Sequence, residues 1–169
     1  MMERWMEHAE LRPEHAAMQK NAGTWLVSAE YRMAPGAPPE ESVMIAQIRP
    51  VMGGRFMIED ISGVMETAPG QQAPWSGMAI SGYDNRLEKH TFVWFDSAGT
   101  SMTTGYGDQT GPNEWTYEYE MYDPMVGAVT QRKNVITVTA PDRHTFDMHT
   151  KQPDGSWFKN MTMEYTRAG

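Results

Sequence analysis

The sequence contains no cysteine, which excludes disulfide bonds, thiolate nucleophiles and metal sites with cysteine ligands. It has no apolar run long enough to span a membrane, and its start, MMERWMEHAELRPEH, mixes both charge signs, unlike a secretory signal. It also lacks a nucleophile elbow, a P-loop and a dinucleotide-binding glycine motif. We therefore expect a cytoplasmic protein, and the sequence favours a function other than catalysis.

Basic residues are in the minority. Lysine and arginine together number 14 against 22 aspartates and glutamates, so the formal net charge is -8. Such a surface repels phosphate backbones and anionic lipids. We expect neither a nucleic acid nor a membrane partner, whereas a homo-oligomer is compatible with the sequence.

Methionine and aromatic residues supply most of the large apolar side chains. There are 16 methionines, 5 phenylalanines, 6 tryptophans and 7 tyrosines, while leucine occurs only at positions 11, 26 and 87. Methionine fills irregular space and adapts to variable apolar partners, and aromatics supply rigid contact area. Two interpretations follow: a core in which methionine replaces leucine, or a deformable apolar cavity.

The N-terminal region carries the only helical signal. Residues 13–20, PEHAAMQK, have proline at a first-turn position and good helix formers, and Asn21 and Gly23 end the pattern. We divide the chain into an N-terminal arm, residues 1–12, and a single domain, residues 13–169.

Beyond Gly23 the pattern becomes that of an all-β protein. Turn residues recur every 8 to 12 positions, and the segments between them alternate between apolar and polar residues. The strands are expected at residues 24–33, 43–49, 55–62, 75–83, 89–96, 101–107, 114–122, 129–139, 144–151 and 157–167. A proline-rich loop is expected at residues 34–42. About ten strands in up-and-down order predict a closed antiparallel barrel, with a sandwich as the alternative.

Seven short motifs extend over nearly the whole chain: GTW, PGAPPEES, GGRF, GYDN, WFDSAGT, DPMVG and EYTR. In this order and spacing they resemble an uncharacterised bacterial family classed as a domain of unknown function. The resemblance covers about residues 13–167. It implies a lipocalin-like (calycin-type) β-barrel and no agreed activity.

The resemblance also implies a role for Trp25. In lipocalin-type barrels a tryptophan at this place closes one end, and a basic residue near the last strand lies across its indole. Arg167 is correctly placed for this contact, which is worth on the order of 1–2 kcal/mol when partly desolvated. We expect this pair to seal the barrel and not to mark the ligand.

A barrel of this size has room for one small ligand. We therefore expect a binding module for a small, largely apolar molecule. The inward-facing candidates for apolar contacts are Tyr31, Trp94, Tyr117, Tyr119 and Met148. Polar groups that would orient the ligand are Arg55, His90 and His149.

Three other hypotheses stay open. The first is an enzyme in the same cavity, with His90 or His149 as general base beside Asp96 or Asp147. The second is a bound cofactor: a divalent metal on the same groups, or haem with His149 or His90 as axial ligand. The third is an interaction protein that uses loop 34–42 or the N-terminal arm. No cofactor or metal is predicted as part of the leading interpretation.

Overall fold

The chain forms a barrel of ten antiparallel strands preceded by two short helices, and the computed structural model describes residues 1–169. The helices are α1 (Met2–His8) and α2 (Pro13–Gln19), and a 3-10 turn, η1 (Met52–Gly54), separates the second and third strands. The strands are β1 (Gly23–Tyr31), β2 (Glu40–Val51), β3 (Phe56–Ala68), β4 (Gln71–Asp84), β5 (Lys89–Asp96), β6 (Thr103–Gly111), β7 (Glu114–Asp123), β8 (Ala128–Ala140), β9 (Arg143–Lys151) and β10 (Trp157–Arg167).

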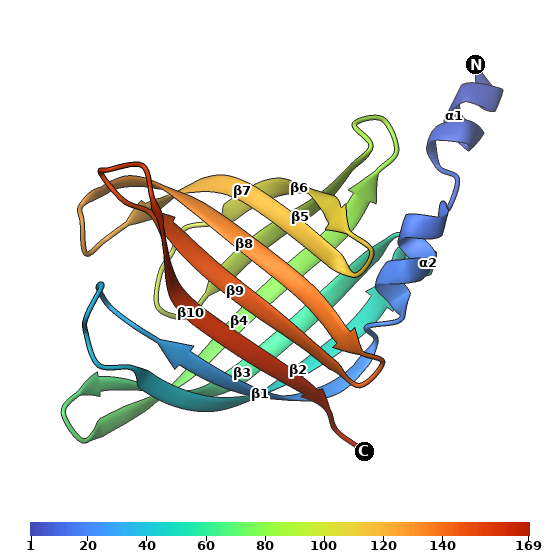
Figure 1. The fold of residues 1–169 in the computed structure, drawn as a ribbon. Coiled ribbons are helices and arrows are strands. Elements are labelled where there is room, and N and C mark those ends of the chain that lie inside the picture. The colour runs from blue at the N-terminus through green and yellow to red at the C-terminus, as the bar shows by residue number, and fades with distance from the viewer.

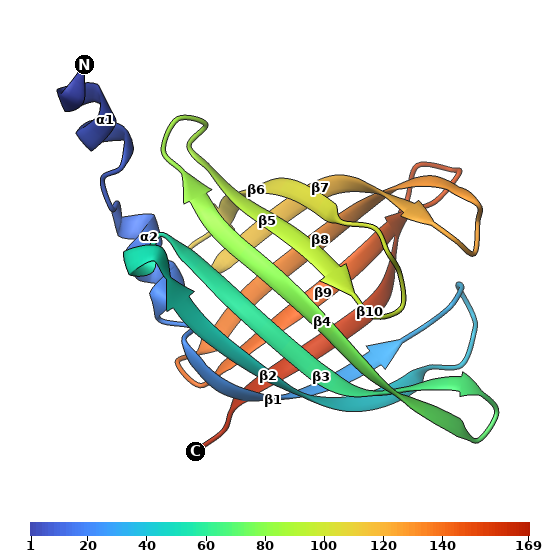
Figure 2. The same ribbon diagram turned by 180° about the vertical axis from the view of Figure 1, so that it is seen from behind.

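Each strand pairs with its neighbours in sequence, and β1 pairs with β10 to close the sheet, as Figure 1 and Figure 2 show from opposite sides. Trp25 lies opposite Arg167 in this closing pair. Closure leaves no strand with an unpaired edge. The closed up-and-down barrel predicted from the sequence is confirmed, and the sandwich alternative is wrong.

The packed core occupies one side of the barrel. In β1, buried side chains alternate with exposed ones, so that Trp25, Val27 and Ala29 all face inward. They belong to a cluster of eight buried residues, to which β2, β3 and β10 contribute Met44, Ala46, Ile61, Met163 and Tyr165. No member of this cluster comes from β4–β9. The barrel is therefore filled on the β10–β1–β2–β3 side and less tightly filled opposite it.

Several strands are longer than the alternation in the sequence indicated. The strand β2 begins at Glu40, inside the predicted loop 34–42, because Tyr31 of β1 pairs with it. The strand β1 itself ends at Tyr31, so Met33 lies outside it. Backbone pairing with a neighbouring strand continues past the point where side-chain alternation fades, and this extends the strands beyond their predicted ends.

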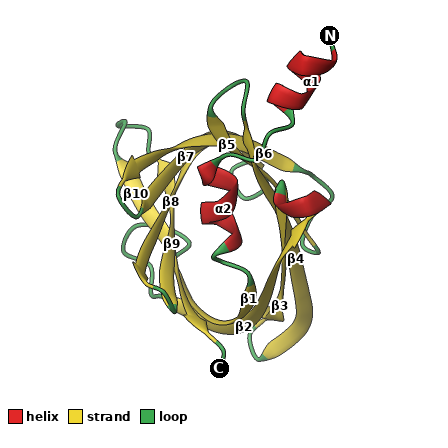
Figure 3. Ribbon diagram, turned by 90° about the vertical axis from the view of Figure 1, so that its right-hand side faces the viewer, coloured by secondary structure: helices red, strands yellow, loops and turns green.

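The helix α2 lies across one opening of the barrel, and α1 projects away from it (Figure 3). At the start of α2 the backbone N–H of Arg12 donates to His15 Nδ1 at 3.0 Å, and Pro13 occupies the first turn. His15 is buried with its ring edge-on to Tyr83 of β4. The predicted helix is confirmed, and it covers the end of the barrel that we call the closed end. Neither helix has the length and apolar character needed to cross a membrane.

Candidate functional site

The inward faces of β4–β10 carry large apolar side chains that are not fully buried. Pairing registers place these residues on the inward face together with the core, yet each keeps partial solvent exposure. They are Phe92, Trp94, Tyr119, Phe146, Met148 and Met161. In a barrel filled with side chains, inward-facing groups in mid-strand would lose contact with solvent. Their partial exposure indicates that solvent reaches the inside of the barrel, and we call this inner region the lumen.

Glycines on the inward face give the aromatic rings a place against the wall. A methyl group at Gly77 would overlap the ring of Trp94, one at Gly105 would come within 2.5 Å of Phe92, and one at Gly107 within 2.5 Å of Tyr117. Aromatic rings that cover cross-strand glycines replace the missing side chains. The rings therefore lie along the wall and not across the lumen.

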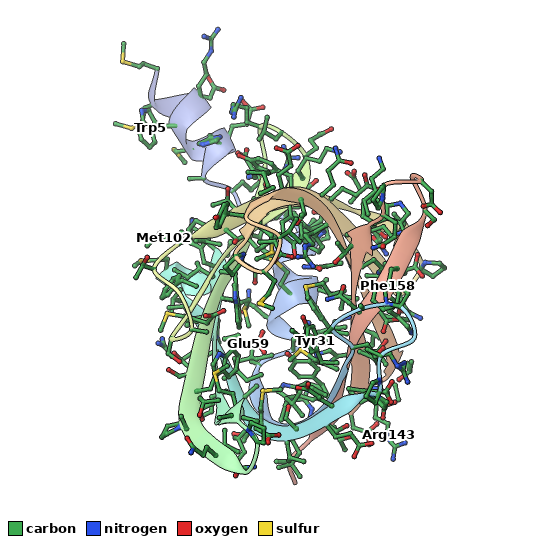
Figure 4. All side chains as sticks on the ribbon, turned by 90° about the vertical axis from the view of Figure 1, so that its left-hand side faces the viewer. Trp5, Tyr31, Glu59, Met102, Arg143 and Phe158 are labelled. Carbon is green, nitrogen blue, oxygen red and sulfur yellow. The ribbon has the colours of Figure 1, made fainter.

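Six of the eight predicted ligand-binding residues face inward in the structure. They lie on β1, β5, β7 and β9 and are Tyr31, His90, Trp94, Tyr117, Tyr119 and Met148. The structure joins two of them through the ring of Phe92, whose centroid lies 5.5 Å from that of Tyr117 and 5.0 Å from that of Tyr119. Figure 4 looks into the barrel from the end opposite α2 and shows Tyr31 inside the ring of strands.

The prediction that Arg55 and His149 lie inside the barrel is wrong. Arg55 lies outside, at the turn before β3, and donates to the backbone oxygens of Met52 at 3.3 Å and Ala9 at 2.8 Å. His149 pairs in register with Lys133 and Lys159, whereas its neighbour Met148 faces inward. Adjacent residues of a strand point to opposite faces, so the two could not both line the lumen.

His90 faces inward but lies at the closed end. Its ring is buried, 5.1 Å from Tyr83 and 6.3 Å from Trp115 between centroids. Burial lowers the pKa of His90, and the carboxylates of Glu14 and Asp108 oppose this only in part. His90 is therefore a neutral packing residue beneath α2 and not an exposed group of the lumen.

The histidine–carboxylate pairs predicted as an enzyme site are not assembled. His90 and Asp96 lie six residues apart on β5, at opposite ends of the strand and thus separated by roughly 20 Å. Asp147 is two residues from His149, but its carboxylate contacts Thr162 at 2.6 Å and Lys159 at 3.3 Å on the outer face. No group of three histidine or acidic side chains is placed to hold a metal ion.

A buried polar cluster, which sequence reasoning missed, lies at the open end of the barrel. The guanidinium of Arg132 contacts Asp123 at 2.6 Å and Thr130 at 3.1 Å, and it also donates to Thr150. Thr150 in turn donates to Asn160 at 3.1 Å. This cluster joins β7, β8, β9 and β10. Because Arg132 stands in an unremarkable run of polar residues, only the pairing register shows that its side chain points inward.

A second buried cluster lies deeper, between the lumen and the closed end. The hydroxyl of Tyr165 donates to Glu59 Oε1 at 2.8 Å, and the ring of His144 stacks on Tyr165 at 4.3 Å. Burial raises the pKa of Glu59, although the hydrogen bond from Tyr165 lowers it. Burial, and then the charge of Arg167, lower the pKa of His144 to about 4. Tyr165 stands in the motif EYTR without a role assigned to it from the sequence, and Glu59 and His144 stand in none of the seven motifs.

Trp25 and Arg167 lie beside this second cluster. The guanidinium carbon of Arg167 lies 4.2 Å from the centroid of the Trp25 ring, and its nitrogens donate to the backbone oxygens of Ala22 at 2.7 Å and Lys20 at 2.9 Å. The indole Nε1 of Trp25 donates to Asn21 at 2.9 Å. The cation–π contact expected from the sequence is therefore present, and it ties the last strand to the segment between α2 and β1.

Residues 10–167 match the family described as a protein of unknown function, DUF1579. The chain belongs to this family. The match covers nearly the whole barrel and the helix α2, and it agrees with the resemblance seen in the motifs. Membership brings no activity with it, and no curated protein matches the chain.

Solved structures share the barrel fold. Rv2717c from M. tuberculosis is similar over 95% of this chain and 100% of its own, with 16% identity and a TM-score of 0.60. A redesigned β-barrel, b11L5F_LGL, and EF1p2_mFAP2b bound to DFHBI have 17% and 15% identity, and each has a TM-score of 0.43. The first matches over 92% of this chain and 96% of its own, the second over 91% and 97%. At such identities the similarity to Rv2717c supports the fold alone.

Proposed function

We propose that this protein binds a small, largely apolar molecule in the lumen of its barrel. The observation that carries the proposal is the partial exposure of side chains that face inward, Trp94 and Met148 among them. An apolar molecule in this space would remove those surfaces from water, at roughly 25 cal/mol per Å² of apolar area. Ligand sites in proteins are commonly of this kind, concave and lined mainly by apolar and aromatic groups.

The position of the lumen supports entry from the end opposite α2. The closed end is covered by α2, the buried His15 and the Trp25–Arg167 pair. The open end carries Tyr31, which is only partly buried. A ligand that enters there meets the open-end polar cluster first and the aromatic wall of β5 and β7 next.

A neutral apolar dye such as Nile red tests the proposal. Saturable binding with a blue-shifted emission is expected for the unmodified protein. Replacing Trp94 or Tyr119 by alanine should weaken binding about tenfold, because each substitution removes apolar contact area worth on the order of 1–2 kcal/mol. Tyr106→Ala is the matched control, since Tyr106 is 55% exposed on the outer face.

A second variant separates loss of contact from loss of fold. Met148→Trp adds bulk on the inward face of β9 and should exclude the dye while leaving the barrel folded, which circular dichroism would report. Dye affinity that is unchanged in Trp94→Ala, Tyr119→Ala and Met148→Trp would overturn the proposal. An equal loss in Tyr106→Ala would do the same, because it would place the dye outside.

A further inference from the structure

Glu59 is an acidic side chain in which only one of the two carboxylate oxygens has a hydrogen-bond partner in the protein. It lies on the inward face of β3, between Ile48 of β2 and Ala79 of β4 in the pairing register. Figure 4 shows it inside the ring of strands. Its Oε1 accepts a hydrogen bond from Tyr165 at 2.8 Å. The other oxygen, Oε2, has no hydrogen-bond partner in the protein and is not shielded from solvent. The Oε2 atom is therefore open to the lumen.

No cation of the protein neutralises Glu59. The strand β10 offers Tyr165 as its hydrogen-bond donor, and Arg167 is committed to Trp25 and two backbone oxygens. The strand β9 contributes His144, which burial keeps neutral, while β2 and β4 present Ile48 and Ala79 in the pairing register. The next residue, Asp60, contacts Arg49 at 3.8 Å. In the helix α2, the charge of Glu14 raises the pKa values of Tyr83 and His90, which lie at the closed end.

The wall beside Glu59 suits a positively charged group. Glu59, Ala79 and Trp94 are in register on β3, β4 and β5, so the Cα atoms of Glu59 and Trp94 are about two strand spacings, roughly 10 Å, apart. The side chain between them, that of Ala79, is small and only partly buried. An ammonium group there would have the carboxylate on one side and an aromatic ring on the other, which attracts cations through its face.

The lumen offers no free cationic side chain that could bind an anionic ligand. At the open end the one buried guanidinium, that of Arg132, is already paired with Asp123 at 2.6 Å and bonded to two threonines. At the closed end the guanidinium of Arg167 is likewise committed. A carboxylate in the lumen would face Glu59 with no free cation to offset the repulsion.

We propose that Glu59 is the recognition group for the ligand, and that the ligand is an apolar molecule that carries a primary or secondary amine. This inference rests on the proposed function and specifies its ligand class. The amine enters as its ammonium form, donates a hydrogen bond to Glu59 Oε2, and places its apolar body against Trp94 and the aromatic wall. Tyr165 holds the carboxylate in position through Oε1.

Amine binding should depend on pH in one direction. Burial raises the pKa of Glu59, so in the free protein the neutral form of Glu59 begins to form at a higher pH than for an ordinary glutamate. An ammonium group favours the ionised form, and binding therefore strengthens as the pH rises through the pKa of Glu59. His144, whose pKa is about 4, stays neutral over this range and does not contribute.

Three probes of equal size test the inference by displacement of Nile red: 4-phenylbutylamine, 4-phenylbutanol and 4-phenylbutanoate. At pH 8 the amine should bind roughly tenfold more tightly than the alcohol, as expected for a hydrogen bond between charged groups, and the carboxylate most weakly. Glu59→Gln should remove the advantage of the amine and leave the alcohol unchanged. Asp60→Asn, next to it on the opposite face, is the matched control and should change neither.

The outcomes separate this inference from the proposed function. If the alcohol binds and the amine binds no more tightly, the inference fails and the function stands. If Nile red binds and none of the three probes displaces it, the inference fails and the function stands, whereas if Nile red itself does not bind, both fail. If Glu59→Gln does not fold, the unmodified protein still decides, because an amine advantage that is the same at pH 4.5 and pH 8 would overturn the inference.

Discussion

The guanidinium of Arg132 lies 2.6 Å from the carboxylate of Asp123, and the two side chains are only 7% and 16% exposed. This pair joins the end of β7 to β8 at the mouth of the barrel. Breaking a buried pair by removing one partner leaves the other charge without compensation. We expect Asp123→Asn to lower the free energy of unfolding by about 3 kcal/mol in a urea titration.

The exposed pair between Arg49 and Asp60 provides the control for this prediction. Its atoms are 3.8 Å apart, and the two side chains are 55% and 45% exposed. Solvent screens such a pair, so Asp60→Asn should change the free energy of unfolding by no more than about 0.5 kcal/mol. Equal losses in the two variants would show that burial of Arg132 is not what makes the pair at the mouth important.

His144 should make the stability of the barrel depend on pH. Its folded-state pKa of about 4 lies below the ordinary value of 6.5, because burial disfavours the charged imidazolium. Between pH 6.5 and pH 4, His144 binds a proton in the unfolded chain but stays largely unprotonated in the folded chain. Stability from this residue is therefore complete above pH 6.5, falls as the pH decreases towards 4, and is then constant, with a total loss of about 3 kcal/mol.

The comparison of the parent protein with His144→Phe isolates this effect from the other titrating groups. Phenylalanine keeps an aromatic ring against Trp25 and Tyr165, whose centroids lie 4.6 Å and 4.3 Å from that of His144. Urea titrations at pH 7 and pH 4 should show that the variant loses less stability than the parent. A proton NMR titration that placed the His144 pKa near 6.5 would contradict the prediction.

Replacing Arg167 should change both the stability of the barrel, through its contact with Trp25, and the pKa of His144. Arg167→Met removes the cation over the indole and two hydrogen bonds to backbone oxygens, for an expected cost of about 2 kcal/mol in unfolding free energy. It should also raise the pKa of His144, since the charge of Arg167 lowers it. Arg167→Lys keeps the charge and should leave that pKa low, although the bonds of the guanidinium are lost.

The fold could be predicted from the sequence because its signals are local. Period-2 alternation and turn residues mark strands one at a time, and EWTYEYEMY became β7 almost without change. The number of strands and their regular spacing then favoured closure, which hides the edges, over a sandwich. Where strand ends are set by the partner strand, as at Glu40, local signals were insufficient.

The site was less predictable because it depends on which face of each strand points inward. An error of one residue reverses the face, as it did for His149 beside Met148. The register is fixed by pairing between strands, including pairs far apart in sequence such as the one between Trp25 and Arg167. For the same reason Glu59 and Arg132, both charged residues, gave no sign in the sequence that they point inward.

Gly77 should be essential for the shape of the lumen. A methyl group there would overlap the ring of Trp94, which lies against the glycine, so the indole would have to move into the lumen. We expect Gly77→Ala to cost about 1–3 kcal/mol of unfolding free energy and to weaken Nile red binding, since overpacking forces side chains from their preferred rotamers. Gly99→Ala is the control, because its methyl group would have no atom within 4 Å, and it should leave stability and dye affinity unchanged. If Gly77→Ala binds the dye as the parent does while its stability falls, the ring moves along the wall, and Trp94 does not border the bound ligand.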